Sequence, residues 1–136
     1  MHIKDKVYVA GHNGMVGSAI VRELKRLGYE NIIMKSMQEL DLRNQQAVDD
    51  FFCNEKPDYV FVAAAVVGGI WANMHGHARF LMENLQMQCN IIDSAYKNNN
   101  QTPKNFVFRT NFFFNKTYKC RDKQNQLNNY YWYGKH

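Results

Sequence analysis

Short apolar runs alternate with longer amphipathic stretches along the first 108 residues of the chain. The runs are rich in Val, Ile, Phe and Ala, and the third consists of apolar residues throughout. Apolar runs of this length and composition indicate strands that are buried in a sheet. We expect four such strands, at residues 6–11, 31–35, 59–67 and 105–108.

The stretches between these runs carry apolar residues at helical spacing. In the first stretch Val16, Ile20 and Leu24 recur every four residues, and Leu27 follows three residues later. A second helix is expected before Pro57 and a third before the last apolar run. Strands that alternate with helices predict an α/β fold, in which helices cover both faces of a parallel sheet.

Three glycines follow the first strand in the stretch "GHNGMVG". Gly11 would permit a tight turn, Gly14 would let a pyrophosphate approach the backbone, and Gly17 would let the helix pack closely on the strand. The helix that begins here would direct its N–H groups at the phosphates. Between a strand and a helix this spacing predicts a dinucleotide-binding, Rossmann-like fold. The alternative is a tight turn that binds no ligand.

The end of the second strand bears on the choice of cofactor. An enzyme that uses NAD usually has an acidic residue there for the ribose 2′-hydroxyl. This chain instead has Lys35 and Ser36, which are suited to a 2′-phosphate, so the sequence favours NADP (NADPH). Asp41 follows shortly and has two readings, as a contact for the adenine or as an N-terminal helix cap.

Longer stretches resemble a known family. The segments "VYVAGHNGMVGSAIVRELKRLGYENII", "ELDLRNQQAV", "FFCNEKPDYVFVAAAVVGGI" and "ENLQMQCNIIDSAY" are similar to the N-terminal part of the GDP-L-fucose synthases. These enzymes are extended short-chain dehydrogenase/reductases. The resemblance implies conversion of GDP-4-keto-6-deoxy-D-mannose to GDP-L-fucose with NADPH, by 3,5-epimerisation and 4-reduction. It also implies a nucleotide-sugar substrate and, as is frequent in the family, a homodimer.

The resemblance covers about residues 3–108 and implies a set of cofactor-binding residues. The family's phosphate loop, its adenine-side Asp-Leu pair and its Ala-rich turn all have counterparts here, and Asn84 and Asn90 would lie in the helix that flanks the site. Together with Lys35, the expected cofactor-binding residues are Gly11, Gly14, Met15, Val16, Gly17, Asp41, Leu42, Ala63, Ala64 and Ala65.

Some positions depart from the family. Asn13 and Met37 stand where the family usually has arginines that help to hold the 2′-phosphate, and Val66 replaces a lysine. Lys35 alone remains of the phosphate-binding cations, and a lysine lacks the forked donors of a guanidinium. The departures therefore predict weaker recognition of the 2′-phosphate than in the family.

No catalytic residue is assigned. After the fourth strand the family has "GSSCIYPK", with a catalytic Ser and a Cys that serves as acid or base; Phe112 and Phe113 fall at these positions. Phenylalanine neither donates a hydrogen bond nor transfers a proton. Tyr131 and Lys135 match the Tyr-x-x-x-Lys spacing of these reductases, but their surroundings favour no helix, so we interpret the match as chance. The family's catalytic His has no counterpart either.

The net charge of +5 is divided unevenly along the chain. Residues 1–96 hold 9 Lys/Arg against 11 Asp/Glu, whereas residues 97–136 hold 8 Lys/Arg and a single Asp. We expect a partial NAD(P)-binding domain of about four strands over residues 1–108. A divergent, irregular and disordered basic tail is expected over residues 109–136.

Other functional classes find little support. No apolar stretch approaches the roughly 20 residues of a membrane span, and the N-terminus has no secretory leader pattern. The three cysteines have no metal-ligand spacing, which favours the cytoplasm and predicts no metal site. Two alternatives to an active GDP-L-fucose synthase homologue stay open: a truncated or frame-shifted, inactive nucleotide-binding fragment, and a nucleic-acid-binding module that uses the tail. Nucleic acid is disfavoured because the tail holds no known binding motif.

Overall fold

A computed structural model describes residues 1–67, 77–98, 105–108 and 117–118. These residues form five strands and three helices, in an order that alternates between the two as far as the fourth strand. The elements are β1 (Val7–Ala10), α1 (Met15–Arg26), β2 (Ile32–Ile33), α2 (Gln45–Glu55), β3 (Tyr59–Val62), α4 (His77–Asn98), β4 (Asn105–Phe108) and β5 (Thr117–Tyr118).

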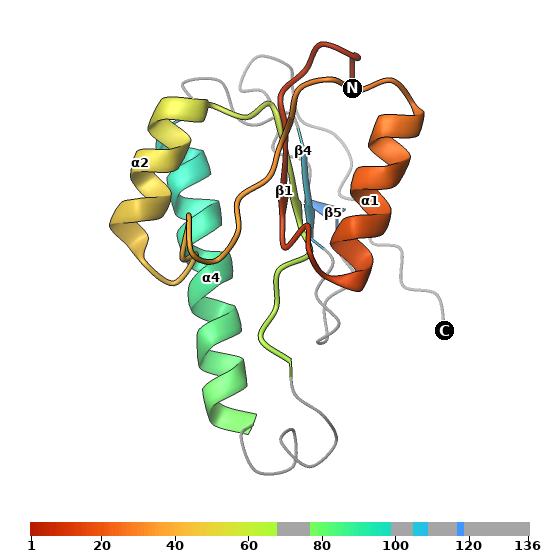
Figure 1. Ribbon diagram of the computed structural model, residues 1–136. Coiled ribbons are helices and arrows are strands. Elements are labelled where there is room, and N and C mark those ends of the chain that lie inside the picture. Colours follow the sequence, from red (N-terminus) through yellow and green to blue (C-terminus); the bar gives the residue numbers. More distant parts are fainter. Residues whose placement is uncertain (68–76, 99–104, 109–116, 119–136) are drawn as a thin grey trace, which may run out of the picture.

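The strands form one sheet in the order β2-β1-β3-β4-β5. The first four strands are parallel, and β1 pairs with β3 from Val7 opposite Tyr59 to Ala10 opposite Val62. Helix α1 covers one face of the sheet, and α2 and α4 cover the other (Figure 1). The α/β fold with a parallel sheet covered on both faces is therefore confirmed.

One strand lies where the sequence predicted none. The two-residue strand β5 pairs antiparallel with β4, inside the stretch that was expected to be an irregular tail. The outer edge of β4 would otherwise present unpaired backbone N–H and C=O groups, which readily accept another strand. A strand of two residues carries no detectable period, so its position could not be predicted from the sequence pattern.

Two apolar clusters fix the helices on the sheet. On one face Val21 and Leu24 of α1 pack with Val7, Val9 and Tyr59. This corrects the predicted apolar face of α1, because the side chain of Leu27 is 50% exposed and stands at the C-cap of the helix. The helix buries Gly17, Val21 and Leu24, which are spaced by four and three residues.

On the other face α2 and α4 pack on the sheet and on each other. Val48 and Phe52 of α2 and Ile91 and Ala95 of α4 are almost fully buried in this cluster. The ring of Tyr8 of β1 packs in a tilted orientation against Phe51 and edge-on against Phe52 of α2, with ring centroids 4.6 and 6.2 Å away. Burial raises the pKa of the Tyr8 hydroxyl far above its usual value, so this side chain stays neutral.

Helix α2 has its N-cap at Asn44, whose side chain accepts a hydrogen bond of 3.2 Å from the N–H of Ala47. Asp41 lies three residues earlier and is not the cap, so that reading of Asp41 is wrong. At the other end Lys56 adopts a left-handed conformation (φ 47°) and Pro57 follows, as expected for a helix stop. No helix among the described residues is long and apolar enough to cross a membrane.

Candidate functional site

A pocket of about 320 Å³ lies where the chain leaves the carboxyl ends of β1, β2 and β3. The chain passes from β1 outward to β2 and then returns across β1 to β3, so the strand order reverses beside β1. In open α/β sheets ligands bind in the crevice at such a reversal. The lining residues are Gly11, His12, Asn13, Gly14, Lys35, Ser36, Met37, Gln38, Leu40, Asp41, Leu42, Arg43, Ala63, Ala64, Ala65, Val66 and Met87.

The pocket gathers most of the residues that the sequence predicted for the cofactor. Gly11, Gly14, Lys35, the pair Asp41 and Leu42, and the turn 63–65 all line it. Three predicted residues lie outside the lining. The side chain of Met15 is 84% exposed, Val16 is half-buried, and Gly17 packs inside the loop. Phe112, Phe113, Tyr131 and Lys135 lie outside the described residues.

Two of the loop glycines are required by the packing of the chain itself. Gly11 has a φ of +80°, and a Cβ there would lie 2.5 Å from the backbone nitrogen of Ala64. A Cβ on Gly17 would overlap the carbonyl oxygen of Gly11. Gly14 is different, because its φ is −76° and a Cβ would meet only the Gly11 oxygen, at 3.4 Å. The chain's own packing therefore gives no reason for a glycine at position 14.

Helix α1 begins directly at the pocket wall. Its N-cap is Gly14, which supplies no side-chain cap, and its first turn contains no acidic residue. The N-terminal N–H groups of a helix lack partners within the helix and carry a partial positive charge. In the same loop, Nδ1 of His12 is buried and has no hydrogen-bond partner among the described residues. The wall formed by this loop thus contains several polar groups that could bind an anion.

The turn after β2 is closed by a carboxylate. The backbone N–H and the hydroxyl of Ser36 both donate to the Glu39 carboxylate, over 2.8 and 2.7 Å. These two bonds, the backbone bond first, hold the pKa of Glu39 below its usual range. The Ser36 hydroxyl proton is therefore engaged by Glu39, which leaves Lys35 as the stronger candidate of the pair for a 2′-phosphate.

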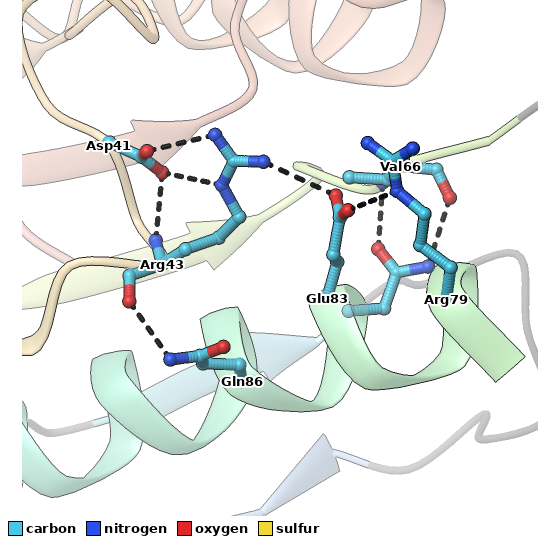
Figure 2. Close-up of polar contacts among 7 residues, drawn as sticks. Asp41, Arg43, Val66, Arg79, Glu83 and Gln86 are labelled. Atoms are coloured by element: carbon cyan, nitrogen blue, oxygen red, sulfur yellow. Dashed lines mark hydrogen bonds and ion pairs between the residues drawn. The ribbon is translucent and has the colours of Figure 1, made fainter.

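Further along the same segment an arginine is held between two carboxylates (Figure 2). Arg43 donates from Nε and Nη2 to the two oxygens of Asp41, over 2.9 Å each, and from Nη1 to Glu83 over 3.3 Å. Glu83 also accepts a hydrogen bond of 2.7 Å from Arg79. Arg43 lowers the pKa of the Asp41 carboxyl, and Arg79, with a smaller contribution from Arg43, lowers that of Glu83.

Helix α4 ties together the two walls that follow β2 and β3. The Asn84 side chain pairs with the backbone of Val66, accepting from its N–H over 2.7 Å and donating to its C=O over 3.0 Å. Gln86 donates to the carbonyl of Arg43, and the buried Asn90 donates to that of Leu42. Asn84 and Asn90 therefore flank the pocket, as predicted, through bonds to the backbone of residues that line it.

Sequence reasoning missed several residues of the pocket. Arg43, Gln38, Leu40, His12 and Met87 line it, but none was among the expected cofactor residues. Arg43 stands two residues after Asp41, close enough in the chain to suggest an ion pair. Met87 reaches the pocket only through the packing of α4, and no local pattern in the sequence indicates it.

The sequence of the chain is similar to those of nucleotide-sugar enzymes. Residues 7–116 match the model of the NAD dependent epimerase/dehydratase family, which runs past the boundary at 108 that the sequence patterns suggested. GDP-L-fucose synthase 1 of Arabidopsis thaliana is 54% identical over 92 residues, which are 68% of this chain and 28% of that protein. GDP-L-fucose synthase of Escherichia coli is 45% identical over 95 residues, or 70% and 30% of the two chains.

A solved structure with bound NADP has a similar fold. It is "MlghC, GDP-mannoheptose C4 reductase from Campylobacter jejuni with NADP bound", with a TM-score of 0.73 and 44% identity. The match covers 79% of this chain and 33% of that one. The chain thus spans less than a third of the length of the two curated relatives.

Proposed function

The chain belongs to the NAD dependent epimerase/dehydratase family, and from this premise we propose that its pocket binds NADPH as the cofactor-binding part of a GDP-sugar epimerase/reductase. The observation that carries the proposal is Gly14. It lines the pocket and has an ordinary backbone conformation, and the chain's own packing leaves ordinary contact room for a Cβ. A glycine is needed there when a ligand comes close to the backbone from outside.

The other walls fit the parts of a dinucleotide phosphate. The uncapped start of α1 and the glycine loop suit a pyrophosphate, since they offer N–H groups and no competing acid. Lys35 suits a 2′-phosphate, and the apolar residues Leu40, Leu42 and Met87 suit a flat base. When bound, NADPH would supply the hydride for reduction of a keto group.

The similarity to GDP-L-fucose synthases supports a GDP-4-keto-6-deoxy sugar as the substrate. A second candidate has a specific observation in its favour, namely that Phe112 and Phe113 stand at the family's catalytic Ser and Cys. Neither side chain can polarise a keto oxygen or move a proton. On this second proposal the chain binds NADPH without catalysing the reaction.

Two measurements on the purified 136-residue chain test both candidates. NADPH is titrated by calorimetry, and its oxidation is then followed in the presence of GDP-4-keto-6-deoxy-D-mannose. Binding accompanied by oxidation would support the epimerase/reductase and exclude the inactive form. We expect binding without oxidation, because of Phe112 and Phe113. Absence of NADPH binding would overturn both candidates.

A further inference from the structure

Arg43 occupies a special place among the residues of the pocket. Lys35 and Arg43 are the only Lys or Arg residues in the described lining, and they stand on opposite sides of the turn that follows β2. Arg43 directly follows the apolar Leu42, and Val66 and Met87 line the same pocket. Its side chain is 32% exposed, so it is neither buried in the core nor fully in solvent.

The hydrogen bonds of Arg43 fix the plane of its guanidinium group. Nε and Nη2 are directed at Asp41 and Nη1 at Glu83, so both edges of the plane face carboxylates (Figure 2). The backbone carbonyl of Arg43 is held in addition by Gln86 of α4. A guanidinium whose edges are engaged in this way keeps its flat faces for contact with an aromatic ring.

The charges around Arg43 argue against a phosphate as its ligand. Asp41 and Glu83 both contact Arg43, and Arg79 contributes a second cation to Glu83. Two cations and two carboxylates leave this cluster without net charge. Lys35 makes no described ion pair or hydrogen bond, although its charge acts on Glu39, and it lies beside the β2 end, so it is better suited to the phosphate.

We propose that Arg43 is a further cofactor-binding residue, which stacks the face of its guanidinium on the purine base of the bound dinucleotide. This inference rests on the proposed function, because it assumes an adenine dinucleotide in the pocket. Asp41 and Glu83 orient the plane, and the ties from α4 hold the loop that carries it. The base contact is common to NADPH and NADH, whereas Lys35 distinguishes them through the 2′-phosphate.

The test distinguishes the effect of a planar side chain at position 43 on binding from the effect of its positive charge. Arg43→Lys keeps the charge and loses the plane, whereas Arg43→Tyr keeps a plane and loses the charge. Dissociation constants for NADPH and NADH are measured with the full chain. We expect Arg43→Lys to weaken both ligands by a similar factor of about three to ten, and Arg43→Tyr to stay within about threefold of the unchanged chain.

A matched control is available on α1. Arg26 makes a comparable two-pronged ion pair with Glu23 but does not line the pocket, so Arg26→Lys should leave both dissociation constants unchanged. Melting temperatures report whether each variant is folded. If Arg43→Tyr fails to fold, the parallel loss in Arg43→Lys still decides the question.

Four results would count against the inference. Full affinity of Arg43→Lys for both ligands would overturn it, and a loss confined to NADPH would show that Arg43 binds the 2′-phosphate instead. Weaker binding by Arg43→Tyr than by Arg43→Lys would assign the effect to charge. If the unchanged chain binds neither NADPH nor NADH, the proposed function fails and the inference fails with it.

Discussion

Gly14 is the N-cap of α1 and Gly17 lies in the first turn of this helix, but the need for glycine differs between them. At Gly17 a Cβ would collide with the backbone of Gly11, so the requirement comes from within the fold. At Gly14 the nearest atom to a Cβ is 3.4 Å away, which is an ordinary contact. On the proposed function, a ligand that approaches the backbone accounts for the glycine at position 14.

This difference gives a paired prediction. Gly17→Ala should destabilise the chain by about 2 kcal/mol, because overlap with backbone forces the helix away from the strand. That loss corresponds to roughly 10 °C in Tm for a domain of this size. Gly14→Ala should lower Tm by only a few degrees, through a poorer N-cap, but weaken NADPH binding at least about tenfold.

Thermal melting and NADPH titration of the two variants provide the check. The comparison contains its own control, since both variants add the same single methyl group near the start of α1. A Gly14→Ala chain that binds NADPH as tightly as the unchanged chain would remove the main support for the cofactor site.

At the scale of elements, α4 holds the pocket walls through side chains that contact loops far away in the sequence. One of these ties depends on pH. The ion pairs hold the pKa of Glu83 below its usual value of 4.5 and that of Asp41 below 3.8 in the folded chain. A carboxyl whose pKa is lowered on folding stabilises the fold above its unfolded pKa, and the contribution disappears as pH falls through the folded pKa.

The expected outcome concerns Glu83→Gln. This variant should melt below the unchanged chain at pH 7. The difference should shrink as pH falls from 4.5 through the lowered pKa of Glu83 in the folded chain, because the carboxylate is protonated there. Melting curves between pH 7 and pH 3 measure the difference. Glu23→Gln is the control, because its ion pair with Arg26 is solvent-exposed and should contribute little. A difference for Glu83→Gln that stays constant over this range would contradict the role of the ion pair.

The sequence predicted the elements better than it predicted their ends. The apolar run 59–67 indicates a strand, but only Tyr59–Val62 pairs in the sheet, since the partner β1 ends at Ala10. The residues that follow turn away and form a wall of the pocket. An apolar pattern does not distinguish a buried strand from a half-buried pocket wall that continues it, and here the run ends at the exposed Val67.

The same limit explains which parts of the site were foreseen. The glycines of the phosphate loop lie within a few residues of one another in the chain, so their spacing could be recognised in the sequence. Met87 is a residue of α4 that lines the pocket, and Arg43 is held by Glu83 of the same helix, about 40 residues away in the chain. Both belong to the pocket because of how α4 packs. The ion pair with Arg43 also orients the carboxylate of Asp41. From the sequence, Asp41 was considered only as a helix cap or an adenine contact, and this ion pair was not predicted.

At the scale of the whole molecule, the pocket and the basic part of the chain are separate in sequence. Every described lining residue lies between Gly11 and Met87, whereas the excess of Lys and Arg begins after residue 96. A chain that ends at Tyr118 keeps β4 and β5 and should therefore bind NADPH within about twofold of the full chain.

The same pair of chains can be titrated with single-stranded nucleic acid at low and high salt. Any salt-dependent binding by the full chain should be strongly reduced in the shorter one, because much of the basic charge is removed. Loss of NADPH binding in the shorter chain would show that residues after 118 contribute to the pocket.

The early position of the pocket has a consequence for synthesis. A ribosome has added every described wall residue once it reaches Met87, and it adds the first residue of β4 roughly one to four seconds later, at about 5–20 residues per second. On the proposed function, dinucleotide in the surrounding solution would meet the growing chain while β3 still has an open edge. A ligand that binds only the ordered form stabilises that form by mass action. NADPH would then assist the folding of the nascent chain.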